Sequence, residues 1–139
     1  MAEVIGIVSG LLTLATFAFD ASVSLRNRIK SYQYHPKQVR DLLEELEALT
    51  AVLGPLQETL SATSKVDLSE LELPLKRCGS ACREFDEEIK KRVTRTGATL
   101  TSFRDWAKIQ YMRDDIDGFR RLISGYKSTI NVALTGATL

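Results

Sequence analysis

The side chains that could carry acid–base or nucleophilic chemistry are few in this chain. His35 is the only histidine, and it stands directly before Pro36. A Ser–His–Asp or Cys–His arrangement would have to use this one imidazole, and no neighbouring residue in the sequence is placed to orient it. We therefore expect no catalytic residue and predict that the chain is not an enzyme.

The two cysteines, Cys78 and Cys82, stand four residues apart and would face the same side of a helix. A zinc site needs further Cys or His ligands, and His35 is the only histidine available. The spacing CxxxC matches no redox motif, and two cysteines make no disulfide framework. Both residues continue an apolar stripe with Leu75 and Phe85, which predicts free thiols buried in a core and a reduced, cytosolic setting. No metal and no cofactor is expected.

The elements that position these residues have a helical pattern throughout. A first helix is predicted from about Glu3 to Lys30, and Pro36 stands at the start of a second one. The apolar residues of the second helix recur at three- and four-residue steps: Val39, Leu42, Leu43, Leu46, Leu49, Leu53, Leu56 and Leu60. The third stripe is Leu71, Leu75, Cys78, Cys82, Phe85, Ile89 and Val93, with its main helix starting at Pro74 after a short turn. The fourth stripe is Phe103, Trp106, Ile109, Met112, Ile116, Phe119, Ile123, Tyr126, Ile130 and Leu134.

These four long segments, joined by short turns and without strand-like alternation, predict an all-α fold. An antiparallel four-helix bundle, with or without one extra short helix, is the natural architecture. The length suits one domain, residues 1–139, with a sizeable core.

Charge is spread unevenly along the chain, although the formal net charge is only +1. Residues 35–75 carry eight acids and three bases, whereas residues 76–139 carry thirteen bases and eight acids. The simplest interpretation is that the two parts pack against each other; a basic surface for anionic lipid is the alternative. The balance gives no reason to expect a nucleic-acid partner.

The opening run, residues 4–19, is the least ordinary feature, because it holds sixteen residues without a charge. It follows Met-Ala-Glu, so it lacks the basic start of a signal peptide. A helix of this length reaches about 24 Å, short of a hydrocarbon core of roughly 30 Å, and extension to Leu25 takes in Asp20. A buried bundle helix therefore fits better than a constitutive membrane span. The run is nevertheless apolar on every side, and Ala2, Gly6 and Gly10 form a small-residue ridge that permits close helix approach.

The opening run GIVSGLLTLATFAFDASVSL and the closing run SFRDWAKIQYMRDDIDGFRRLISGYKSTINVAL resemble a known family. It is the fungal N-terminal domain found on NACHT-type and other STAND receptors, also described from an azaphilone pigment cluster protein and grouped with the HeLo-like domains. The resemblance covers essentially the whole chain, and its closing run is the most specific part. It implies a four-helix bundle that serves as the effector end of an immune-type receptor. Related domains oligomerise and permeabilise the plasma membrane in regulated cell death, with the N-terminal apolar segment implicated.

On this basis we expect a domain that is cytoplasmic at rest and moves to the plasma membrane on activation. It would homo-oligomerise and bind anionic membrane lipids, with other helical domains as further partners. The expected membrane-engaging and oligomerisation residues are Ala2, Val4, Ile5, Gly6, Ile7, Val8, Gly10, Leu11, Leu12 and Leu14. Arg26, Arg28 and Lys30 follow the apolar run and are expected to stay at the lipid headgroups. The alternative is a helical interaction module that oligomerises or recruits a partner without touching lipid.

Overall fold

The computed structural model describes residues 2–32, 37–62, 68–94 and 113–138, with side chains described from Gly10 in the first helix, to Lys91 in the third, and from Asp115 to Gly136 in the last. The elements are α1 (Ala2–Lys30), α2 (Lys37–Ser61), the short 3-10 helix η1 (Ser69–Leu71), α3 (Glu72–Thr94) and α5 (Arg113–Thr138). The described part of the chain contains no strand, so the predicted all-α class is confirmed.

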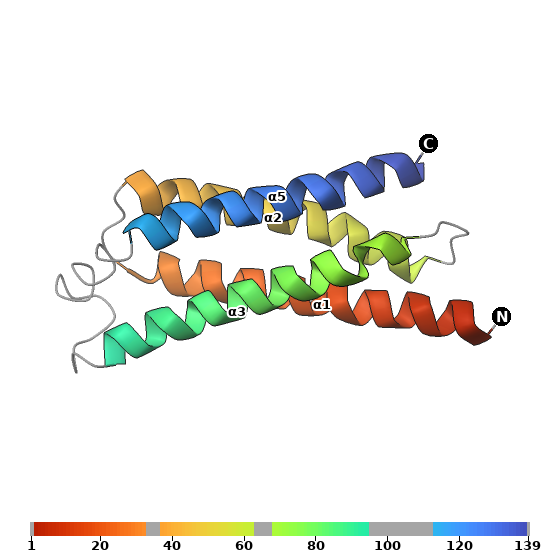
Figure 1. Ribbon diagram of the computed structural model, residues 1–139, viewed down its shortest axis with the longest axis horizontal. Helices are drawn as coiled ribbons and strands as arrows, with labels where there is room; N and C mark the ends of the chain where they lie inside the picture. The colour runs from red at the N-terminus through yellow and green to blue at the C-terminus, as the bar shows by residue number, and fades with distance from the viewer. Residues whose placement is uncertain (1, 33–36, 63–67, 95–112, 139) are drawn as a thin grey trace.

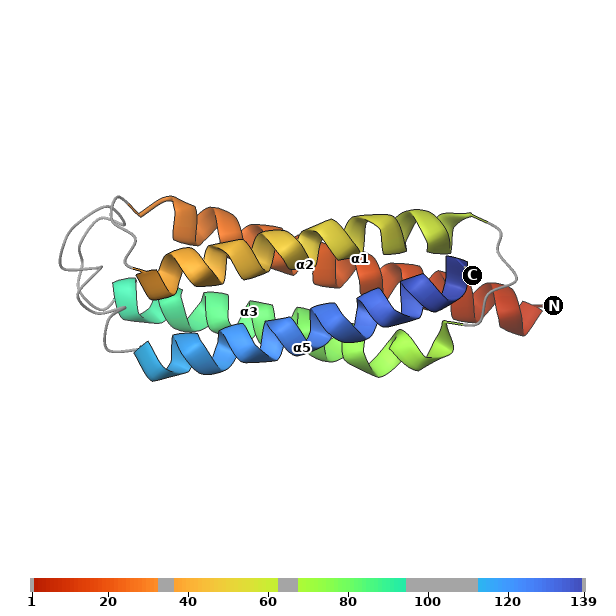
Figure 2. The same ribbon diagram turned by 90° about the horizontal axis from the view of Figure 1, so that it is seen from above.

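The four α-helices lie along one long axis, each antiparallel to the one before it in sequence (Figures 1 and 2). The N-terminus of α1 and the C-terminus of α5 therefore lie at the same end of the bundle. α1 packs closely against α3 and α2, and α2 packs against α5, whereas α3 and α5 touch only sparsely. The order around the bundle is α3–α1–α2–α5, and α3 and α5 have the widest backbone separation of the adjacent helices. The predicted antiparallel bundle is confirmed.

α2 supplies much of the core because its leucines follow the helical repeat. All eight apolar residues predicted to face inward are buried. Each fully buried leucine contributes about 1.5–3 kcal/mol relative to an exposed one. The acidic side of α2 meets bases from its neighbours, as with Lys127 Nζ of α5, which lies 2.7 Å from Glu45 Oε1. This contact agrees with the expectation that the acidic and basic parts of the chain pack together.

The third segment begins slightly earlier than its proline suggests. Pro74 predicts the helix start, whereas α3 begins at Glu72, directly after η1. That prediction is wrong by two residues, because the first four N–H groups of a helix have no intrahelical acceptor and proline is tolerated among them. η1 is the short preliminary turn that the sequence predicts before the main helix.

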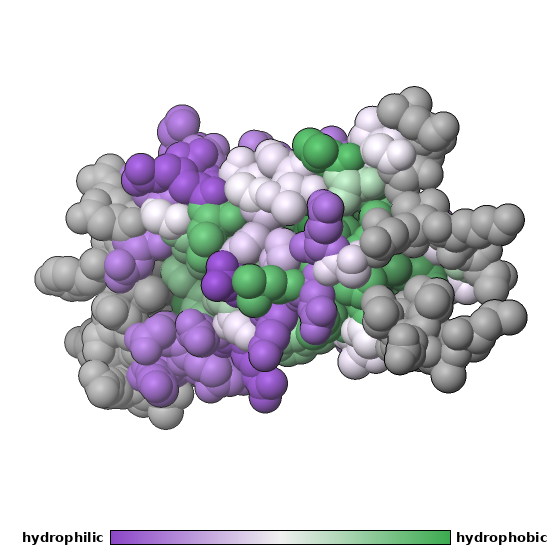
Figure 3. All heavy atoms as spheres, turned by 45° about the vertical axis from the view of Figure 1, so that its right-hand side comes forward, coloured by the Kyte–Doolittle hydropathy of each residue, from purple (hydrophilic) through white to green (hydrophobic). Residues whose placement is uncertain are grey.

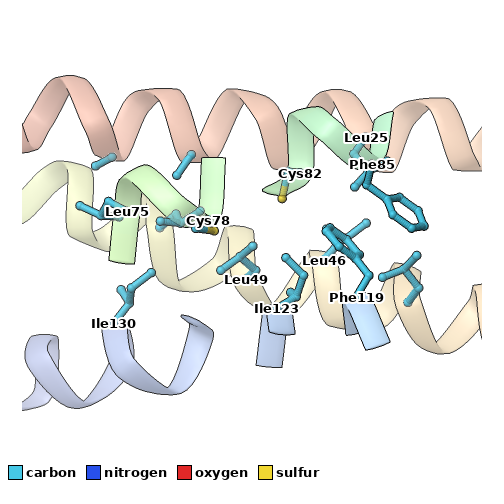
Figure 4. Close-up of a cluster of buried hydrophobic side chains, with 14 of the residues drawn as sticks. Leu25, Leu46, Leu49, Leu75, Cys78, Cys82, Phe85, Phe119, Ile123 and Ile130 are labelled. Carbon is cyan, nitrogen blue, oxygen red and sulfur yellow. The ribbon is translucent and has the colours of Figure 1, made fainter. Parts of the chain in front are cut away.

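The centre of the bundle is apolar and receives side chains from every helix (Figure 4). Phe85 of α3 and Phe119 of α5 stack with ring centroids 4.3 Å apart and planes inclined by 14°, and so join these two helices through the core. Cys78 and Cys82 are buried free thiols within this core, as predicted.

The fourth predicted stripe is described only from Arg113 onward. Ile116, Phe119, Ile123 and Ile130 are buried, as expected for its C-terminal part. Phe103, Trp106, Ile109 and Met112 lie outside the described residues.

Candidate membrane-engaging segment

The apolar run lies on α1, whose first turns project past the ends of the other helices (Figures 1 and 2). α1 has 29 residues and so extends for about 43 Å. Its backbone is helical from Ala2, which places the predicted membrane-engaging residues on one continuous helix. The side chains of Ala2, Val4, Ile5, Gly6, Ile7 and Val8 lie outside the described residues, and their predicted roles stay predictions.

The part of the run with described side chains is only half engaged in the core. Leu11 is buried, whereas Leu12 and Leu14 are partly buried against the core cluster. Gly10 is exposed, and a Cβ added there would meet no other atom within 4 Å. In the bundle, one face of this run is therefore buried in the core and another face is exposed to solvent.

α1 packs against its neighbours through small side chains. Ala15, Ala18 and Ser22 recur at helical spacing and are completely buried. The Ser22 hydroxyl donates to the Ala18 carbonyl at 2.7 Å and lies 3.6 Å from Cys82 Sγ of α3. Small groups allow close helix approach but bury fewer methylenes than leucine, at about 0.8 kcal/mol per CH₂. This face of α1 is thus held by less apolar burial than α2.

A large side chain of α1 packs against a glycine of α3. The Phe17 ring of α1 lies against the backbone of Gly79, and a Cβ at that position would come within 3.1 Å of Phe17 Cζ and nearer still to Cε2 and Cδ2. The sequence pattern does not predict this pair, since a glycine in a helix gives no sign of the side chain that packs against it.

The predicted headgroup residues lie at the other end of α1, and two of them are already paired. The Arg28 guanidinium Nε donates to Asp86 Oδ1 of α3, in a partly buried contact. Lys30 Nζ lies 3.1 Å from Glu47 Oε1 of α2, and both side chains are about half exposed. Arg26 is partly buried. In the bundle, these bases therefore tie α1 to both of its neighbours.

Asp86, which the sequence pattern did not single out, is the buried partner of Arg28. It is one of two buried polar or charged residues among those described, the other being Ser22. Removing one partner of a buried ion pair is costly because the remaining charge is left without compensation. A signal was present: Asp86 interrupts the edge of an apolar stripe, between Phe85 and Ile89.

The residues weighed for chemistry are not assembled into a site in the described part of the chain. The contact with Cys82 and burial raise the pKa of the Cys78 thiol, which keeps it protonated and unreactive at neutral pH. Within the described ranges, no cluster of three or more His, Cys, Asp or Glu residues could hold a metal ion. His35 lies outside the described residues.

The fold and the projecting apolar helix define a helical-bundle domain whose distinguishing element is α1. The chain belongs to the family described as pigment biosynthesis cluster protein PigL N-terminal, which matches residues 2–139. The family predicted from the opening and closing runs is thereby confirmed. Neither a curated protein nor a solved structure is similar enough to count as a match. Among the described residues, no helix combines the length and apolarity needed to cross a membrane.

Proposed function

We propose that this chain is the N-terminal effector domain of a fungal NLR-type receptor, which homo-oligomerises and permeabilises the plasma membrane to trigger regulated cell death. It is not an enzyme on this proposal, and it waits in the cytoplasm until activated. α1 is the element that enters the bilayer, and anionic lipids are its ligands.

The construction of α1 is the observation that carries this proposal. α1 is about 43 Å long, but its uncharged run reaches only about 24 Å, so on this proposal the run enters the hydrocarbon region and the bases at the end of α1 stay at the headgroups. Its central packing face consists of the small side chains Ala15, Ala18 and Ser22, so α1 itself gives up fewer buried methylenes on leaving the bundle than the leucine-rich α2 would. Asp20, exposed in the resting bundle, would face the interior of an oligomer, where charged membrane residues are tolerated.

Release of α1 also frees the bases that hold it. Arg28 would then leave Asp86 and bind a lipid phosphate, and Lys30 would leave Glu47 and do the same. Each base near an anionic membrane surface gains about 1 kcal/mol. Arg28 and Lys30 thus act as ties in the bundle and as anchors at the headgroups.

Dye leakage from vesicles containing anionic phospholipid tests this proposal. Gly10→Asp adds a charge in the middle of the apolar run at a position with open space, so the fold should survive. A buried aspartate near the centre of the membrane costs about 2.5–3.5 kcal/mol, which lowers insertion about a hundredfold. Leakage should be largely lost.

Gly54→Asp is the matched control, because Gly54 also has open space but lies on α2. Its leakage should equal that of the parent, and both variants should melt like folded helical proteins. Equal leakage by parent and Gly10→Asp, or an inactive parent, would rule out membrane insertion of α1. Purely zwitterionic vesicles should leak less than anionic ones.

The second candidate function is a helical interaction module without membrane activity. Two exposed apolar side chains of α5, Leu122 and Val132, favour it, since they could bind another helix whether or not lipid is present. A parent that forms oligomers but leaves vesicles intact would support this candidate.

A further inference from the structure

The outer face of α5 carries exposed apolar side chains that the bundle does not use. Among the described residues, three large hydrophobic side chains are exposed, and two of them, Leu122 (43%) and Val132 (72%), lie on α5. Figure 3 shows green and white side chains along the upper part of the view, where α5 lies in Figure 1, and purple ones gathered toward the left. A shallow groove runs beside this face, between Val132 and Thr129 of α5 and Leu71 of η1.

These residues belong to a regular stripe, which we call the α5 outer stripe. Its members follow one another at steps of four, three, four, three and four residues: Gly118, Leu122, Gly125, Thr129, Val132 and Gly136. This spacing places the six residues on one face of the helix, and such a face can pack against another helix because none of the six is charged. All six positions are exposed in the bundle. The Thr129 hydroxyl donates to the Gly125 carbonyl at 3.0 Å, so its polar atom is satisfied within the helix.

Within the part of one copy that the structure describes, no close packing accounts for the glycines of the stripe. A Cβ added at Gly118, Gly125 or Gly136 would meet nothing within 4 Å. Glycine inside a helix costs about 1 kcal/mol relative to alanine. Close approach of a second helix is a use that would offset this cost.

We infer that the α5 outer stripe binds the same stripe of a second copy, with the two α5 helices antiparallel. A two-fold pair requires a self-complementary surface, and the step order of the stripe is the same in both directions. When residue i faces residue 254 − i of the partner copy, three kinds of pair form: Gly118 with Gly136, Leu122 with Val132, and Gly125 with Thr129. Each large side chain then meets a large one, and each glycine meets a glycine or a threonine.

Charge selects this antiparallel pairing over a parallel one. In the antiparallel register Arg121 lies opposite the uncharged Ala133, and Asp115 lies beyond the end of the partner's helix. A parallel pair would place Arg121 beside its own copy and Asp115 beside its own copy, which is repulsive. The helix dipoles also oppose each other only in the antiparallel arrangement.

The size of the stripe makes the pair weak. Its 18 steps cover about 27 Å of helix, so at a width of about 10 Å the contact is roughly 270 Å² per copy. A standard stable interface buries about 800 Å² per partner. The pair should therefore form at high local concentration. The inference names a surface for the homo-oligomerisation in the proposed function, but it needs no membrane activity.

Paired cysteine variants test the register directly. Leu122→Cys mixed with Val132→Cys should give a disulfide-linked mixed dimer under mild oxidation at high protein concentration. Either variant alone should link at least tenfold less, because ten residues along the helix separate it from its own copy by about 15 Å. The parent, with Cys78 and Cys82 buried, sets the background.

Analytical ultracentrifugation of the parent and of two charge variants provides a second measurement, the concentration at which the protein self-associates. Val132→Lys should raise the concentration needed for self-association about tenfold or more, since a charge enters an apolar contact. Leu73→Lys, at an exposed apolar position of α3 outside the stripe, should associate like the parent. Linking of each cysteine variant mainly with itself, or a parent that stays monomeric while no mixed dimer forms, overturns the inference. Mixed dimers without vesicle leakage would retain the inference and reject the membrane proposal.

Discussion

At the scale of single residues, two bases that the sequence suggested for lipid contact form ion pairs within the bundle. Arg28 and Lys30 are paired with Asp86 and Glu47, on two different helices. The Arg28–Asp86 contact is the more protected, with side-chain exposures of 20% and 10%. It is therefore the stronger candidate for a tie that must break before α1 moves.

Asp86→Asn should weaken the bundle and ease activation. The substitution leaves Arg28 partly buried without its carboxylate, which we expect to cost about 1–3 kcal/mol, less than for a fully buried pair because the contact is partly solvated. Urea unfolding measures this loss, and vesicle leakage should begin at a lower protein concentration. As a control, Asp41→Asn removes the carboxylate that pairs with the exposed Lys37 within α2. It should lower the free energy of unfolding by no more than about 0.5 kcal/mol.

General destabilisation is controlled by Ile130→Val, a core change on α5 that should cost about 0.5–1.5 kcal/mol. If this variant lowers the leakage threshold as much as Asp86→Asn, the ion pair has no specific role in holding α1.

The thiols of Cys78 and Cys82 should react slowly in the native protein. Both side chains are fully buried, and the raised pKa of Cys78 keeps its thiol protonated. Labelling with a maleimide at neutral pH should therefore follow opening of the bundle and speed up in denaturant. Rapid labelling of both residues under native conditions would contradict their place in the core.

At the scale of the elements, two glycines on neighbouring helices show opposite requirements. Gly79 of α3 lies under the Phe17 ring, whereas Gly125 of α5 faces open space. The same residue type thus serves close packing in one helix, and in the other it leaves a face that a single bundle does not fill.

Alanine substitution at these two glycines should separate the roles. Gly125→Ala should raise the free energy of unfolding by about 0.5–1 kcal/mol through helix propensity alone. Gly79→Ala should lower it by about 1 kcal/mol, because overpacking against Phe17 typically costs about 1–3 kcal/mol and exceeds the propensity gain. Urea unfolding measures both. Equal stabilisation by the two variants would show that the Phe17 ring moves aside freely.

At the scale of the whole molecule, the bundle is a ring of helices whose contacts are unequal. α1 is packed on α2 and α3, and α5 on α2, whereas the backbones of α3 and α5 make few contacts with each other. Movement of α1 would therefore separate it from two partners, and a covalent tie to either should block it.

A reversible cross-link between α1 and α2 tests this movement. Gln57 Nε2 donates to Thr16 Oγ1 at 3.1 Å on the exposed surface, so Thr16→Cys with Gln57→Cys can be joined by a short, cleavable bis-maleimide. The joined protein should lose vesicle leakage and regain it when the linker is cleaved. Each single variant, treated with the same reagent, should keep its leakage. Full leakage by the joined double variant would mean that α1 need not leave α2.

For the residues that the structure describes, the sequence by itself predicted the helices, their antiparallel order and most of the core. The leucine repeat of α2 was sufficient because burial of one helix face depends on spacing that is local to the chain. The buried thiols followed from the same stripe logic. The helix start predicted from Pro74 was wrong by two residues, since the N–H groups in the first turn of a helix have no intrahelical acceptor and proline is tolerated there.

Only the tertiary structure decided which residues meet across helices. Asp86 with Arg28, Glu47 with Lys30, and Phe17 with Gly79 are separated by 58, 17 and 62 positions in sequence. No local pattern encodes such partners, because they depend on the rotation and axial offset of one packed helix against another.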